Sequence, residues 1–182
     1  MATKQLLEVI ALVVQIISFP FAAWSIYLAR KEAKASRDLQ IALNLSESFR
    51  SRWEGGWSDA LYRVEEAQKT SSTNKVPREY EDRLYQMLNW IDWLGVLIRT
   101  KSLSEKRIIF DSIGPQFIEI INFGRPLVES NIEERGPKFW AGLLTVAHEQ
   151  SVKQSVQWTA SYYSELLDDE SKPTKASRHI IL

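Results

Sequence analysis

A run of twenty-one residues without a charged side chain, Val9 to Ala29, most constrains how this chain can fold. An α-helix rises about 1.5 Å per residue, so the run covers about 30 Å, the thickness of the hydrocarbon core of a bilayer. The run therefore predicts one membrane-spanning helix, with the rest of the chain on one side of the membrane.

A cleaved signal peptide is the alternative interpretation of this run. A signal peptide has an apolar core of about 7–15 residues followed by a small-x-small cleavage site. Here the apolar run is longer, and the segment that follows it, Arg30 to Lys34, is mostly charged. We therefore expect an uncleaved anchor.

The charges that flank the run predict its orientation. Lys4 and the amino terminus lie on its short side, and four basic residues lie within eight residues of its other end. The positive-inside bias then places the C-terminal part in the cytoplasm, with the anchor in the inner (cytoplasmic) membrane. The four basic residues are also candidates for contact with anionic lipid headgroups, although a topology signal alone explains them as well. They are Arg30, Lys31, Lys34 and Arg37.

One face of the run is small or polar. Steps of three and four residues keep positions on one face of a helix, and in lipid small residues allow close helix approach while Gln and Ser can hydrogen-bond between helices. This stripe predicts self-association, or the polar lining of an enclosed pathway. The alternative is a lone helix that tolerates a few polar residues. The stripe consists of Glu8, Ala11, Gln15, Ser18, Ala22, Ser25 and Ala29.

The helical pattern continues without a breaker from Lys31 to Arg50, and Gly55-Gly56 interrupts it. We therefore expect an all-α fold in which one N-terminal transmembrane helix continues into a cytoplasmic helical bundle. The expected organisation is a transmembrane anchor (1–30), a juxtamembrane helix extension (31–53), a cytoplasmic helical domain (54–167) and a flexible tail (168–182).

Apolar spacing and breakers predict the helices of the domain. Helices are expected over Trp57–Lys69 and Pro77–Thr100, separated by a loop. A capping box at Ser102-Leu103-Ser104-Glu105 predicts the start of another helix. The remaining expectations are a break at Gly114-Pro115, a helix over Phe117–Ser130 bent at Gly124–Pro126, a break at Gly136-Pro137, and a long or broken helix over Lys138–Leu167.

The composition excludes several classes of protein. The chain has 23 Lys and Arg against 23 Asp and Glu, so it lacks the excess of basic charge that nucleic-acid binders usually carry. It has no Cys and only two His, and no P-loop or glycine-rich nucleotide motif is present. We expect no catalytic residue, no metal site, no cofactor and no nucleic-acid partner. Arg99, Arg125 and Arg135 would form a phosphate site only if the fold brought them together; surface ion pairs are the expected alternative.

Five stretches follow one another in a recognisable order. They are LNLSESFRSRW (43–53), WSDALYRV (57–64), YQMLNWIDWLGVLIRTKSLS (85–104), IIFDSIGPQFIEIINFGRPLVE (108–129) and GPKFWAGL (136–143). In these stretches the chain resembles a bacterial family of small membrane-anchored helical domains of unknown function. The resemblance covers residues 5–148 and implies a cytoplasmic α-helical domain attached to a membrane, with no catalytic residues to carry over.

In layout the chain is also similar to the membrane accessory proteins of RNA-targeting CRISPR systems, which combine one N-terminal span with a helical domain in a ring around a pore. A degenerate form of the Arg-x4-to-6-His motif of helical ribonucleases is expected in that group, but this chain lacks the motif. It requires an arginine five to seven residues before a histidine. Those positions hold Leu143, Gly142 and Ala141 before His148, and Thr174, Pro173 and Lys172 before His179.

These features favour two hypotheses and leave a third. The first is a self-associating single-pass membrane protein, an effector or accessory factor in phage defence that acts by assembly or by forming a pore. The second is a membrane-tethered module that recruits a cytoplasmic protein partner without membrane activity. An enzyme with an unrecognised site is the third, and we expect the chain not to be an enzyme.

Overall fold

The computed structural model describes residues 2–70, 76–103, 105–149 and 152–171, and the side chains of residues 1–20, 22 and 23 lie outside this description. The chain consists of two compact units, Met1–Ile41 and Ala42–Leu182. The described residues form helices and connecting turns and contain no strand, which confirms the all-α prediction.

The first helix, α1 (Ala2–Arg52), is continuous, as expected from the absence of a breaker between Lys31 and Arg50. Its backbone also remains helical through Pro20. Within the described part of the chain, no helix combines the length and apolar character needed to cross a membrane. Most of the apolar run, namely residues 9–20 with 22 and 23, lies outside the described side chains, so the transmembrane prediction gains no support here.

A sharp change of direction follows α1, at the predicted break. The π-helical turn η1 (Trp53–Trp57) contains Gly56, whose φ of 111° and ψ of 4° lie in the left-handed region where a Cβ is strained. The Ser58 hydroxyl donates a hydrogen bond to the Trp53 carbonyl oxygen, 3.0 Å away, across this turn. The next helix, α2 (Ser58–Thr70), begins there, close to the predicted start at Trp57.

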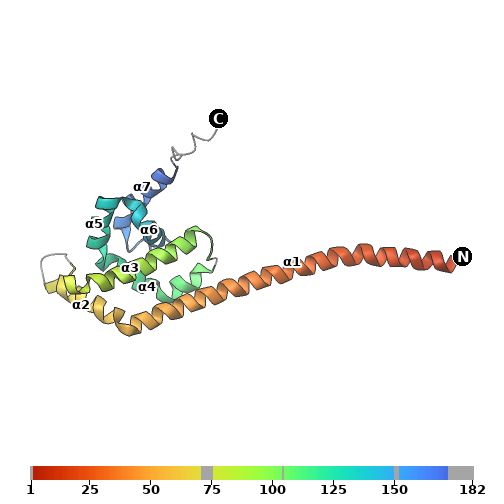
Figure 1. Cartoon of the computed structure of the whole chain (residues 1–182), viewed down its shortest axis with the longest axis horizontal. Coiled ribbons are helices and arrows are strands. Elements are labelled where there is room, and N and C mark those ends of the chain that lie inside the picture. Colours follow the sequence, from red (N-terminus) through yellow and green to blue (C-terminus); the bar gives the residue numbers. More distant parts are fainter. Residues whose placement is uncertain (1, 71–75, 104, 150–151, 172–182) are drawn as a thin grey trace, which may run out of the picture. The chain divides into compact units, whose positions relative to one another are not determined.

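The central helix of the second unit is α3 (Arg78–Arg99), which agrees with the predicted Pro77–Thr100 (Figure 1). Its buried face contains Leu84, Met87, Leu88, Ile91 and Leu94, whose spacing of three and four residues places them on one side of the helix. The remaining elements are α4 (Lys106–Phe123), α5 (Arg125–Arg135), η2 (Pro137–Trp140), α6 (Ala141–Ala147), η3 (Gln157–Thr159) and α7 (Ala160–Ser171).

The predicted break at Gly114-Pro115 is wrong, because α4 runs through both residues. Proline disfavours helix through its missing N–H, through a clash of its ring with the carbonyl of residue i−4, and through a clash with the Cβ of the preceding residue. Gly114 has no Cβ to clash. The carbonyl that loses its partner belongs to Asp111, which is exposed and can be hydrated. The breaks at Gly124 and at Gly136, by contrast, are confirmed.

The capping box at Ser102 is wrong: α4 begins at Lys106, and the Ser102 hydroxyl instead lies 2.9 Å from that of Thr100. Of the two forms expected for Lys138–Leu167, the structure has the broken one, since α6 ends at Ala147 and α7 begins at Ala160. α7 continues to Ser171, into the predicted tail, and residues 172–182 lie outside the described part.

In the second unit, the backbones of α3 and α6 come into close contact where the two helices cross. Both helices contribute a glycine, Gly95 and Gly142. A Cβ placed at Gly95 would overlap the Gly142 carbonyl, and one at Gly142 would overlap the Asp92 carbonyl oxygen. Only glycine lets the two backbones approach this closely, so the crossing requires these two residues.

The Asp92 carboxylate caps α6 from the neighbouring helix α3. Its Oδ1 accepts a hydrogen bond of 2.8 Å from the Leu143 N–H, and the Gly142 N–H also donates to this carboxylate. These N–H groups belong to the first turn of α6, where a helix has no internal partner for them. Burial raises the pKa of Asp92 above its ordinary value, while the two N–H donors and Arg99 act in the opposite direction.

We expect Gly95→Ala to destabilise the second unit by about 3 kcal/mol, because the added methyl group meets rigid backbone in a packed crossing. Urea unfolding followed by tryptophan fluorescence measures the loss. Gly55→Ala is the matched control, since nothing lies within 4 Å of a Cβ there. Equal stability of the two variants would contradict the crossing.

The raised pKa of Asp92 gives stability a defined pH dependence. Between the ordinary value of 3.8 and the raised folded pKa, the folded chain holds a proton that the unfolded chain has lost. The stabilisation that Asp92 adds to the folded state is therefore fully present below pH 3.8 and is lost as the pH rises through the folded pKa.

We expect Asp92→Asn to keep the cap and to be at least as stable as the natural chain at pH 7, because the amide oxygen still accepts and no buried charge remains. Asp92→Ala removes the acceptor and should cost about 1–2 kcal/mol. The measurement is the free energy of unfolding of each variant from pH 3 to 7. Equal losses for both variants at pH 7 would show that the carboxylate charge, and not its acceptor, supports α6.

Candidate functional site

The last turns of α1 are fixed to the second unit by an aromatic cluster around Phe49, which is 1% exposed. The rings of Trp57, Trp90 and Phe117 meet Phe49 edge-on, with centroids 5.8, 5.2 and 5.4 Å away. Trp53 stacks on it at 5.7 Å. Edge-to-face pairs add to the energy of apolar burial, so the cluster makes the end of α1 part of the core.

Of the predicted stripe, only Ser25 and Ala29 lie among the described side chains, and both are exposed. The Ser25 hydroxyl donates to the Phe21 carbonyl oxygen, 2.9 Å away in the same helix. Because this hydroxyl already has a hydrogen-bond partner, moving it from water into apolar surroundings costs little free energy. The other stripe residues, Glu8, Ala11, Gln15, Ser18 and Ala22, lie outside the described side chains.

Large apolar side chains next to these two positions are exposed. Phe21 is 72% exposed, Trp24 is 59% exposed and Tyr27 is 58% exposed, and Ile26 and Leu28 accompany them. Contiguous exposed apolar surface of this kind marks a site for a partner or a membrane. The ring centroids of Trp24 and Tyr27 lie 5.8 Å apart, so the two amphipathic rings form one group.

The four predicted headgroup residues follow directly along the same helix. Arg30, Lys31, Lys34 and Arg37 are all exposed, and none takes part in the ion pairs formed within the described chain. Glu32 is the one acidic residue between Arg30 and Arg37, so this segment has a net charge of +3 by sequence, four basic residues less one acidic. The segment is therefore an unpaired basic cluster beside exposed aromatic rings.

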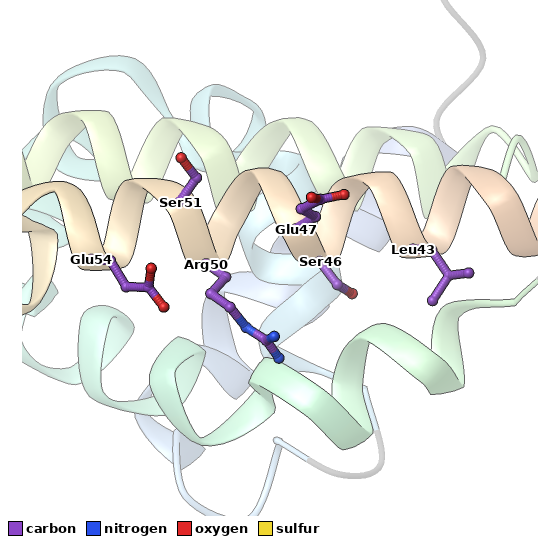
Figure 2. A pocket seen from close by; sticks show the side chains of 6 residues that line it. All are labelled: Leu43, Ser46, Glu47, Arg50, Ser51 and Glu54. Atoms are coloured by element: carbon purple, nitrogen blue, oxygen red, sulfur yellow. The ribbon is translucent and has the colours of Figure 1, made fainter.

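The outer face of the end of α1 carries a groove of about 510 Å³ that the sequence alone did not predict. Figure 2 shows its lining side chains, which come from α1 and the start of η1. On one flank the Ser46 hydroxyl lies 3.4 Å from that of Ser112 in α4. The lining combines one aliphatic, two hydroxyl and three charged side chains: Leu43, Ser46, Glu47, Arg50, Ser51 and Glu54.

No group of three or more metal-ligating side chains occurs in the portion of the chain that the structure describes. His148 stacks on the Tyr163 ring, with centroids 4.1 Å apart. The three arginines considered as a phosphate site are each engaged separately, as the ion-pair alternative predicted. Arg99 pairs with Glu170, Arg125 with Glu129, and Arg135 with Glu134.

Comparison with known proteins finds no family model, no curated protein and no solved structure that matches this chain.

We expect Phe49→Ala to lower the free energy of unfolding by about 3–4 kcal/mol, because it empties the centre of the aromatic cluster. Tyr62→Ala is the control, since the Tyr62 side chain in α2 is 60% exposed and should cost less than about 0.5 kcal/mol. Both are measured by denaturant unfolding with tryptophan fluorescence. A small effect at Phe49 would mean that the end of α1 does not belong to the core.

Proposed function

We propose that this chain is a single-pass protein of the inner (cytoplasmic) membrane that self-associates and acts as a membrane effector or accessory factor. The anchor is the Val9–Ala29 run, and the helical bundle that follows it lies in the cytoplasm. The observation that carries the proposal is the order of exposed groups along α1. Exposed apolar and aromatic residues from Phe21 to Leu28 are followed at once by four exposed basic residues that form no ion pair with the described part of the chain.

This order suits a membrane–water boundary. Tryptophan and tyrosine favour the interface because their rings are apolar at one end and polar at the other, and Trp24 and Tyr27 lie at that level. Each Lys or Arg near an anionic surface contributes about 1 kcal/mol. Contacts with anionic headgroups would therefore fix the position of the membrane surface on α1 at the start of the cytoplasmic part. The residues that would make these contacts are Arg30, Lys31, Lys34 and Arg37.

The stripe supports self-association. In hydrocarbon, Gln15 and Ser18 lower their energy by hydrogen-bonding to another helix, and Ala11 and Ala22 let that helix approach closely. The neighbouring positions off the stripe, such as Val13 and Ile17, are large and apolar and suit lipid. We infer that copies of the chain meet along Glu8, Ala11, Gln15, Ser18, Ala22, Ser25 and Ala29.

Action by assembly, without catalysis, fits the composition. The chain has no Cys, and its two His have no neighbouring residues that suggest a triad. We propose phage defence as the setting of this assembly, because the layout of the chain resembles that of CRISPR accessory proteins, with a pore as one form that the assembly can take.

The alternative is a membrane-tethered module that recruits a cytoplasmic protein. The observation that favours it is the open groove on α1, which presents Leu43 and three charged side chains to solvent.

Because the chain has no Cys, single cysteines report contacts without background. We expect Ala11→Cys, Ser18→Cys and Ala22→Cys to form disulfide-linked dimers on oxidation in membranes, and Val13→Cys and Ile17→Cys to form few. Equal crosslinking on both faces would contradict the stripe.

Dye leakage from liposomes then separates a pore from a simple assembly. Assembly with leakage supports membrane perturbation, whereas assembly without leakage favours the recruiting module.

A further inference from the structure

The groove on α1 combines apolar surface with charges that have no partner in the described chain. Leu43, one of its lining residues, is 48% exposed. Arg50 lies three residues after Glu47 and four before Glu54, yet no ion pair joins these side chains. Figure 2 shows the Arg50 side chain extending away from both carboxylates.

Oppositely charged side chains four apart on a helix can pair, and the described helices show both outcomes. Ion pairs at this spacing form at Arg63–Asp59, Lys69–Glu65, Arg107–Asp111 and Arg125–Glu129. No ion pair joins Arg78 to Asp82 or Glu79 to Arg83 in α3, which have the same spacing as Arg50 and Glu54. The one cation and two carboxylates of the groove are available to pair with another molecule.

The groove also repeats the register of the stripe. The stripe positions 8, 15, 22 and 29 are seven residues apart, and two further steps of seven from position 29 lead through Ser36 to Leu43. Likewise, positions 11, 18 and 25 lead by steps of seven to Ser46, and Arg50 follows Leu43 by seven. A seven-residue repeat on a continuous helix is the spacing of a left-handed coiled-coil seam, and α1 is continuous from Ala2 to Arg52.

We propose that the groove lined by Leu43, Ser46, Glu47, Arg50 and Glu54 docks a second copy of this chain, and so extends the assembly seam outside the membrane. The inference rests on the proposed function, since copies anchored in one membrane with the same orientation have parallel α1 helices. Leu43 and Ser46 of one copy then meet the same positions of the next. Arg50 of one copy reaches a carboxylate of the other, Glu47 or Glu54.

The charges favour a second copy over a lipid headgroup. With two carboxylates and one guanidinium, the groove has a net charge of −1, which repels an anionic headgroup. The same set complements itself, because each copy supplies both the cation and the carboxylates that the other needs.

The test uses the full chain in membranes and a matched pair of serines. Ser46 lines the groove, whereas Ser48 is exposed on the same helix outside it. We expect Ser46→Cys and Leu43→Cys to form disulfide-linked dimers on oxidation, and Ser48→Cys to form few. Equal crosslinking at Ser48 would indicate random collision and would overturn the proposal.

The charges are tested by reversal and exchange in the Ser46→Cys background. Arg50→Glu places three carboxylates in every groove and should weaken association about fivefold, as read from the crosslinked fraction. Adding Glu54→Arg restores one cation among two carboxylates and should recover most of the crosslinking. Circular dichroism of each variant checks that the helices persist. Loss without recovery in a folded double variant would contradict the pairing of Arg50.

Comparison with the stripe cysteines separates this inference from the proposed function. Crosslinking at Ser18→Cys but not at Ser46→Cys would leave the membrane assembly in place and overturn the groove. Crosslinking at Ser46→Cys alone would support the groove and reject the stripe. Crosslinking at neither position would overturn both.

Discussion

The burial of Phe49 among Trp57, Trp90 and Phe117 is the interaction on which the second unit depends. These rings come from four elements: the end of α1, the η1 turn that directly follows it, and the more distant helices α3 and α4. Because Phe49 lies in α1, the last turns of that helix cannot leave the bundle without exposing its aromatic core. The helix that carries the apolar run is thus also a core helix, with no linker between these two roles.

The α3–α6 crossing is a second constraint, and it shows what one sequence cannot reveal. Gly95 lies inside a strongly periodic helix, where glycine is ordinarily unfavourable, and its reason for being there is Gly142, 47 residues later by sequence position. Asp92 likewise caps a helix that begins far from it along the chain. Periodicity predicts which face of α3 is buried, but it does not identify the helix that covers that face.

The errors in the predicted boundaries have a common physical cause. A prediction from sequence patterns treats each Gly or Pro as a helix breaker by itself, whereas its effect in the structure depends on the neighbouring residues. Gly114 removes the Cβ that would clash with Pro115, so two residues that each disfavour helix are compatible with it together. A broken helix was one of the two forms expected for Lys138–Leu167, but the sequence between Ala147 and Ala160 has no Gly or Pro that would locate the break between α6 and α7. Only part of the candidate site could be predicted from the sequence. The stripe and the basic cluster follow from residue spacing and charge. The groove could not be predicted, because the burial of Phe49 determines which face of α1 stays exposed.

The central claim is that copies of this chain assemble through α1 in a membrane. The most direct test is the mass of the detergent-extracted protein by native mass spectrometry. The account predicts a particle that contains several chains of 21.0 kDa, after the detergent is removed in the gas phase. A single chain of 21.0 kDa in a mild detergent, or a protein that stays in the aqueous fraction without detergent, would contradict it.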